Sequence, residues 1–317
     1  MEQSTLLAAL NSVTAIPVIP FKDGQIDFDG HRKNVAYLMS NNYLSDNRPR
    51  VIAIGGTSLL HHIEAKDQVA LVEATGQQME DANVRTDVNG ILISGIVPNP
   101  ISQAEELIRV QSNLDRVPDA YLLMPLSGIN NPDGIYQQYS QFAQKFGEQY
   151  GARFLYYFRQ KRNLEVVIRL VNESPHFIGV KVGTDESDIE ALVNDIGDGG
   201  LVMWGIGDRC TQAHRLGTRG HTSGIAVAFA RASDEINNAQ RLGDLDASQR
   251  IEDKIAALEE IRFRNERIYN YSAVVEAMIQ SGFDDIEGGT GGPFNPRLPS
   301  EIVVEVKAAI ADLKSYH

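Results

Sequence analysis

The sequence has 317 residues, of which 43% are hydrophobic and 22% charged, and its formal net charge is −13. These values are typical of a globular protein, and the length suits a single α/β barrel. The acidic balance argues against a protein that coats nucleic acid, because neutralising phosphates needs clustered lysine and arginine. An acidic protein can still bind a small anion where positive charge gathers locally.

The chain has no apolar run near the roughly 18 residues that a membrane span requires, so we expect no membrane partner. Its N-terminus has no basic region and no small-residue cleavage pattern, so we expect no secretory signal and a cytoplasmic protein. The single cysteine, Cys210, excludes an internal disulfide and a zinc ribbon. A small packing role suits it better than that of a nucleophile.

Short runs rich in valine, isoleucine and leucine alternate with segments of helical periodicity. The runs predict eight strands, at residues 14–21, 50–56, 89–96, 120–125, 153–158, 177–182, 200–206 and 221–227. Helices are predicted between them, at 31–42, 64–79, 102–114, 133–150, 163–173, 187–196 and 209–217. Strands too apolar for a solvated face indicate a parallel sheet covered by helices, and eight repeats indicate a closed (β/α)8 TIM barrel. The polar stretch 40–50 is interpreted as a surface insertion.

The last ninety or so residues predict helices alone, at 227–243, 246–270, 272–282 and 299–316. Since no Gly/Pro/Ser-rich linker precedes them, we expect a barrel over residues 1–227 and a C-terminal helical extension, 228–317, packed on it. An open doubly wound sheet is the alternative architecture. The stretch "GIGDRC" after a strand is a weak dinucleotide motif, because it lacks the third glycine.

Lys181 is a charged residue in the apolar run "FIGVKV", and it has two interpretations. Its side chain either points outward and reaches water between strand and helix, or enters the barrel. Val180 and Val182 face the opposite side of the strand from Lys181, so valines packed against the helices would place the lysine inside. A buried lysine has a lowered pKa, and its neutral amine attacks carbonyl carbons to form a Schiff base.

Further candidate residues lie at predicted strand ends, where a barrel builds its active site. Tyr156 on the preceding strand is either a proton shuttle or an aromatic core residue. The turn Gly55-Gly56-Thr57-Ser58 offers backbone N–H groups and hydroxyls to a carboxylate, or is a plain tight turn. Lys161, near Arg159 and Arg162, is a candidate for binding an anionic substrate, although a solvated basic loop is the simpler interpretation.

Taken with the first-strand sequence "IPVIPFKDGQIDFDG", these motifs and their spacing resemble the dihydrodipicolinate synthase / N-acetylneuraminate lyase family of class I aldolases, over nearly the whole chain. The resemblance implies a (β/α)8 barrel, a homotetramer or dimer, and a Schiff-base lysine that acts on 2-oxo acids such as pyruvate. It also implies that no cofactor and no metal is needed. Lys181 would be the Schiff-base lysine, Tyr156 the catalytic tyrosine, and Thr57 a carboxylate-binding residue.

The sequence departs from the family pattern at several positions. The carboxylate-binding turn lacks its first threonine and its glutamate. Leu126 and Ser127 stand where tyrosines are expected, and Lys161 replaces an arginine that binds the semialdehyde carboxylate in the synthases. We therefore expect a Schiff-base lyase, an aldolase or a dehydratase, leaning to a keto-deoxy sugar-acid substrate. The alternatives are dihydrodipicolinate synthase activity and an inactive barrel that only binds a ligand.

Other polar groups are candidates for the same site. Ser127 and Ser223 are predicted to contact substrate, and Asn130 and Thr222 to influence specificity; Asp208 and Gly224 are expected at the barrel mouth. His61, His62 and Glu64 lie close together without the spacing of a helical metal motif, so no metal site is predicted. The glycine-rich stretch 287–299 lacks the lysine and hydroxyl of a phosphate-binding loop and is interpreted as the connection to the last helix.

Overall fold

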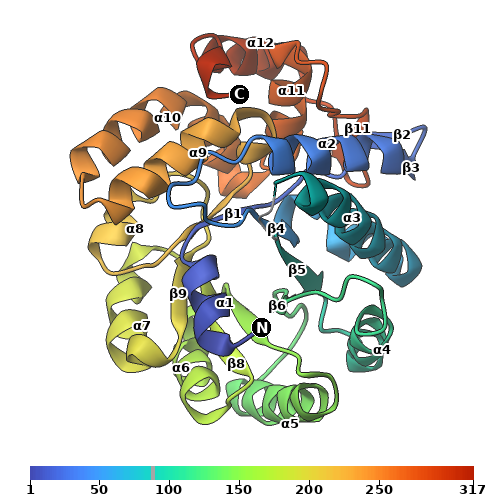
Figure 1. Cartoon of the computed structure of the whole chain (residues 1–317), viewed down its shortest axis with the longest axis vertical. Coiled ribbons are helices and arrows are strands. Elements are labelled where there is room, and N and C mark those ends of the chain that lie inside the picture. The colour runs from blue at the N-terminus through green and yellow to red at the C-terminus, as the bar shows by residue number, and fades with distance from the viewer. Residues whose placement is uncertain (87–89) are drawn as a thin grey trace.

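The computed structural model of the chain describes residues 1–86 and 90–317. In this part of the chain eight parallel strands close into a barrel in the order β1-β10-β9-β8-β7-β6-β5-β4, with helices around it (Figure 1). The strands are β1 (Val13–Ala15), β4 (Val51–Ile54), β5 (Ile91–Ile96), β6 (Ala120–Leu123), β7 (Phe154–Phe158), β8 (Phe177–Val182), β9 (Leu201–Trp204) and β10 (His221–Ser223). The predicted (β/α)8 TIM barrel is confirmed, and the open sheet is excluded.

Several observed strands are shorter than predicted: the strand expected at 221–227, for example, ends at Ser223. The strand expected at 14–21 ends at Ala15, and Phe21 begins a separate hairpin of β2 (Phe21–Lys22) and β3 (Gln25–Ile26). Prolines at positions 17 and 20 explain the early end, because proline has no N–H to donate to a ladder. The strand expected at 89–96 begins at residue 89, which lies outside the described residues.

The helices follow the strands, as in other barrels of this class. They are α2 (Phe28–Ser40), α3 (Ala65–Thr86), α4 (Ile101–Gln111), α5 (Pro132–Tyr150), α6 (Leu164–Glu173), α7 (Ile189–Ile196), α8 (Thr211–Arg215) and α9 (Ala226–Arg241). A further helix, α1 (Gln3–Leu10), precedes the first strand and was not predicted. Across the described ranges, no helix combines the length and apolarity needed to cross a membrane.

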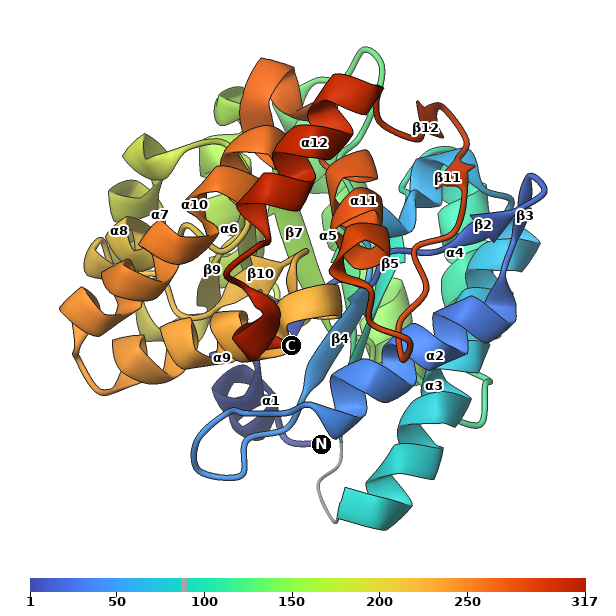
Figure 2. The same cartoon turned by 90° about the horizontal axis from the view of Figure 1, so that it is seen from above.

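The C-terminal region is helical, as the sequence indicates. The helices α10 (Leu245–Arg267), α11 (Ser272–Ser281) and α12 (Ser300–Ala309) lie together beside the barrel (Figures 1 and 2), and a small hairpin of β11 (Gly291–Gly292) and β12 (Asn295–Pro296) joins the last two. The predicted boundary between residues 227 and 228 falls inside α9, which follows β10 directly as the eighth helix of the barrel. Therefore the extension begins after α9.

The strand register decides which side chains enter the barrel. Thr14 on β1 pairs with Thr222 on β10, and its hydroxyl lies 3.8 Å from the sulfur of Met203 on β9, so all three face the interior. Met203 in turn pairs with Lys181, which pairs with Tyr157 on β7. Paired residues of parallel strands face the same side, so one interior layer contains Lys181 and Tyr157.

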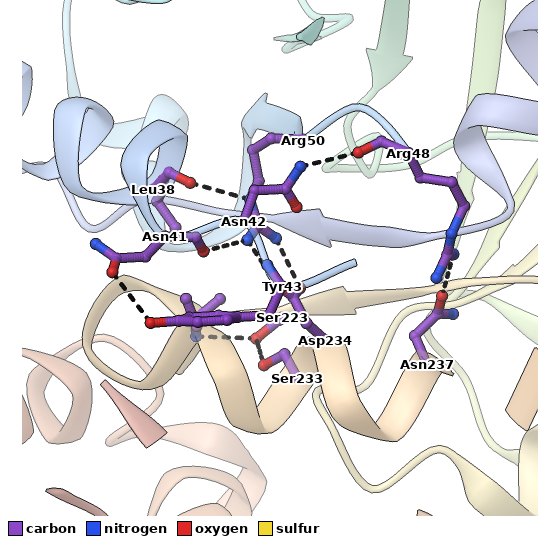
Figure 3. Close-up of polar contacts among 12 residues, drawn as sticks. Leu38, Asn41, Asn42, Tyr43, Arg48, Arg50, Ser223, Ser233, Asp234 and Asn237 are labelled. Carbon is purple, nitrogen blue, oxygen red and sulfur yellow. Dashed lines mark hydrogen bonds and ion pairs between the residues drawn. The ribbon is translucent and has the colours of Figure 1, made fainter. Parts of the chain in front are cut away.

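The polar stretch 40–50 is anchored and is not the surface insertion that its composition suggests. Arg50 is 1% exposed, and both its terminal nitrogens reach the carboxylate of Asp234 on α9, at 2.8 and 2.7 Å (Figure 3). Arg48 donates to Asn237 on the same helix. A buried arginine requires such partners, since an unpaired charge is costly to desolvate. These bonds connect the segment that leads into β4 with α9.

Candidate active site

Lys181 lies inside the barrel near the carboxyl end of β8. The residue is 3% exposed, and its neighbours Val180 and Val182 are fully buried on the helix side of the strand. Its ammonium nitrogen is 4.3 Å from the centre of the Tyr157 ring. Gly205, after β9, provides the room, since a Cβ there would lie 2.7 Å from Lys181 Cγ. The structure thus gives Lys181 the inward orientation, in which its amine faces a cavity at the barrel mouth.

The tyrosine beside this lysine is Tyr157, whereas Tyr156, the predicted shuttle, lies on the other face of the strand. Tyr156 pairs with Val180, so its side chain points outward between β7 and α5. There its ring lies 5.9 Å from that of Tyr139, and its hydroxyl accepts a 3.2 Å hydrogen bond from Asn163. Tyr157 lines the cavity together with Lys181.

The pKa values of the two tyrosines move in opposite directions. Burial raises the pKa of Tyr156 to about 12, which makes it a poor proton donor and acceptor at neutral pH. Burial also acts to raise the pKa of Tyr157, but the positive charges of Lys181, Arg159 and Arg267 outweigh it and lower the pKa. A hydroxyl with a lowered pKa is better suited to exchange protons.

Burial is also the main cause that lowers the pKa of Lys181. The negative charge that Tyr157 can carry opposes this shift, whereas the guanidinium groups of Arg159, Arg267 and Arg262 add to it. A lowered pKa increases the fraction of neutral amine, which is the form that attacks a carbonyl. The site therefore favours a nucleophilic lysine.

The turn after β4 forms another part of the cavity wall. Gly56 and Thr57 line the cavity, and the Thr57 hydroxyl donates to the carbonyl of Ile16 at 3.2 Å. Ser58 is turned away, because its hydroxyl accepts from the Gly55 N–H and donates to the Pro17 carbonyl. The residues form a short 3₁₀ turn, whose first N–H groups have no acceptor within the turn. Gly56 and Thr57 can thus present backbone donors to an anion.

The C-terminal extension supplies a wall that the sequence did not predict. Arg262, Phe263, Arg267 and Asn270 all line the cavity. Arg262 is buried, paired with Glu259, and donates to Asn270 at 2.8 Å. The α10 backbone is non-helical at residues 264–266, and this interruption turns Arg267 towards the barrel, where it donates to the Gly183 carbonyl at 3.3 Å.

Comparisons with known proteins agree with this architecture. Residues 122–290 match the sequence profile of the Dihydrodipicolinate synthetase family. The chain belongs to this family. Among curated protein sequences, none matches the chain.

Solved structures of family enzymes share the fold at low identity. Dihydrodipicolinate synthase from Bacillus clausii is 22% identical, with a TM-score of 0.85 over 98% of this chain and 99% of that one. The Oceanobacillus iheyensis enzyme is 17% identical, with a TM-score of 0.84 over 99% and 100%. The Acinetobacter baumannii enzyme, complexed with pyruvate, is 22% identical, with a TM-score of 0.80 over 96% and 99%.

Three other predicted site residues of this family member lie away from the cavity. Lys161 is exposed and pairs with Asp185 at 2.7 Å, so its charge is already engaged outside the barrel. Ser127 is exposed and accepts from the Asn99 amide at 3.0 Å. Ser223 is buried behind the barrel wall, where it donates to Asp208 at 2.9 Å. Its neighbour Thr222 faces inward and lines the cavity, as does Gly224.

Sequence reasoning missed Tyr157, Arg267 and Asn270. The sequence did contain a signal for Tyr157, because the residue that pairs with Lys181 on a neighbouring strand must face the same side. No comparable signal marks Arg267 or Asn270. They reach the cavity because α10 packs beside the barrel and its backbone is interrupted.

Proposed function

We propose that the protein is a Schiff-base-forming lyase that acts on pyruvate or a pyruvate-like 2-oxo acid. The observation that carries the proposal is Lys181, a lysine buried inside the barrel with a lowered pKa and its amine towards a cavity. Membership of the Dihydrodipicolinate synthetase family supports the same chemistry. Aldolase and dehydratase reactions both follow from one imine intermediate.

In the proposed mechanism the neutral Lys181 amine attacks the C2 ketone, and the resulting carbinolamine loses water to form an iminium ion. Tyr157 would deliver the proton that allows the oxygen to leave as water. The iminium then accepts electrons from the neighbouring carbon when a proton or a carbon fragment departs from it, which gives an enamine. Gly56 and Thr57 would hold the C1 carboxylate during these steps.

For the substrate we favour a keto-deoxy sugar acid, as the Gly-Gly-Thr form of the turn suggests. The second candidate is dihydrodipicolinate synthase activity, because the solved relatives carry that name. The pairing of Lys161 with Asp185 counts against it, since this lysine stands where the synthases bind the semialdehyde carboxylate. Turnover of a panel of keto-deoxy sugar acids, compared with pyruvate plus semialdehyde, separates the two.

The class of reaction is tested by exchange of the pyruvate methyl hydrogens in D2O, followed by NMR. An imine that converts to an enamine exchanges these hydrogens without any second substrate. We expect exchange with the wild-type protein and none with Lys181→Met. Pyruvate binding without exchange would contradict the proposal and would instead support a barrel that only binds its ligand.

We also propose that the protein forms a homo-oligomer, a tetramer or a dimer, as the resemblance implies. Ile129, in the loop after β6, supports this because its side chain is fully exposed. Contact with another subunit would remove this apolar side chain from water. Sedimentation velocity tests the assembly state, and a monomer at all concentrations would contradict the proposal.

A further inference from the structure

Positive charge gathers on one side of the cavity of this acidic protein. The Arg159 guanidinium carbon lies 5.9 Å from the centre of the Tyr157 ring, over which Lys181 is also placed. Arg267 donates to the carbonyl of Gly183, and a Cβ on Gly183 would lie 2.6 Å from Arg159 Cδ. The two arginines and the lysine therefore lie close to Tyr157 and Gly183, at the ends of β7 and β8.

These two arginines differ from the neighbouring ones in their partners. Arg262 pairs with Glu259, and Arg264 pairs with Glu305 at 2.9 Å. Within the described ranges, neither Arg159 nor Arg267 forms an ion pair with a carboxylate. Burial and the charge of Arg159 lower the pKa of Arg267, and the negative charge that Tyr157 can carry offsets this only in part.

The backbone that positions Arg267 is unusual. The φ angles of Asn265, Glu266 and Arg267 are 49°, 57° and 73°, so three consecutive residues with side chains adopt the left-handed region. Such residues cost free energy, and they persist where the surrounding structure requires them, often at ligand sites. The interruption separates Arg264, which pairs with a surface glutamate, from Arg267, which lines the cavity.

We propose that Arg159 and Arg267 bind a second anionic group of the substrate, at the end remote from its C1 carboxylate. This rests on the proposed function, since Lys181 holds the ketone between the two ends. The turn after β4 and the end of β8 lie on opposite sides of the closed barrel, so the two anion sites are separate. The planar guanidinium group can form paired hydrogen bonds with the oxygens of either a carboxylate or a phosphate. The substrate class is therefore a 2-oxo acid with a terminal carboxylate or phosphate.

Calorimetric titration of the whole protein without reductant tests this inference. The two probes are 2-oxoglutarate and 2-oxopentanoate, which have the same chain length and differ in the terminal carboxylate. We expect the dicarboxylate to bind about tenfold more tightly or better, as charge-assisted hydrogen bonds to arginine allow. Equal affinities, or no measurable binding of either, would overturn the proposal. A third probe, 2-oxo-4-phosphonobutanoate, shows whether a phosphate-like or a carboxylate end is preferred.

Matched variants assign the effect to the two arginines. Arg267→Gln should bring the affinity ratio of the two acids close to one, whereas Arg264→Gln, on the same segment, should keep it. Arg159→Gln is the second test, because this exposed residue can change without loss of the fold. If Arg267→Gln weakens both acids equally, the arginine binds the C1 carboxylate and the proposal is wrong. An affinity ratio that stays unchanged in both Arg159→Gln and Arg267→Gln would overturn it as well.

The proposed function and the second anion site are contradicted by different experimental results. If no pyruvate adduct forms on Lys181 but the ratio depends on Arg267, the anion site stands and the imine chemistry does not. If the adduct forms and the ratio is one, the imine chemistry stands and the second anion site does not.

Discussion

Tyr157 and Lys181 are register partners on adjacent strands, and the lysine nitrogen lies 4.3 Å from the centre of the tyrosine ring. The phenol and the amine therefore face the same cavity at the same level of the barrel. Tyr156, one residue earlier, is directed to the opposite face of β7. This arrangement makes several properties of the protein testable.

The two adjacent tyrosines provide a matched pair of variants. Tyr157→Phe should slow exchange of the pyruvate methyl hydrogens by roughly 10²- to 10⁴-fold, the usual contribution of a positioned proton shuttle. Tyr156→Phe should leave exchange nearly unchanged and cost about 1 kcal/mol of stability, since it removes the hydroxyl that accepts from Asn163. Slow exchange in Tyr156→Phe together with normal exchange in Tyr157→Phe would show that Tyr156 is the proton shuttle.

Substitution of Lys181 should change how stability depends on pH. The folded protein lowers the pKa of this lysine, so the unfolded chain binds the proton more readily. Stability attributable to Lys181 thus rises with pH until the unfolded pKa of about 10.4 is passed. Lys181→Met should raise the free energy of unfolding at pH 7, by about 1.4 kcal/mol for each unit of pKa lowering, and the gain should disappear near pH 10.5.

Urea unfolding at several pH values measures this effect. A gain that stays constant with pH would show that packing of the methionine, and not removal of a buried charge, is responsible.

Gly205 is expected to tolerate no side chain. A Cβ at this position would lie 2.3 Å from the Val182 carbonyl oxygen and 2.7 Å from Lys181 Cγ. Gly205→Ala should cost about 1–3 kcal/mol of stability through overpacking and should displace the lysine, with roughly 10²-fold slower exchange. Gly199→Ala is the control, since nothing lies within 4 Å of its Cβ. Similar values for both variants would contradict the packing argument.

The ion pair of Arg50 with Asp234 should be important for folding. Both side chains are essentially buried, so Asp234→Asn leaves an uncompensated charge and should cost about 3–5 kcal/mol. The partly exposed pair of Arg231 and Glu235 on the same helix is the control, and Glu235→Gln should cost less than about 1 kcal/mol. Chemical denaturation measures both. A loss below 1 kcal/mol for Asp234→Asn would show that water reaches Arg50.

Much of the barrel could be predicted from local sequence. The eight apolar runs gave the strands because a parallel strand is buried on both faces and has a simple signature. Lys181 stood out for the same reason, since a charge in such a run needs an explanation. The alternation with Val180 and Val182 left two orientations open, and the structure has the inward one.

The remaining features depend on contacts between distant segments. Tyr156 and Tyr157 are chemically identical neighbours, so strand register alone distinguishes them. Arg50 looked like part of a polar loop because its partner, Asp234, is far away in the sequence. Arg267 follows a continuous helical pattern, and nothing local predicts three left-handed residues around it.

The most direct measurement of the central claim is borohydride reduction of the protein in the presence of pyruvate, followed by peptide mapping with mass spectrometry. The proposed chemistry predicts a single reduced pyruvate adduct, located on Lys181 and absent from Lys181→Met. An adduct on another lysine, or no adduct at all under conditions where pyruvate binds, would contradict it.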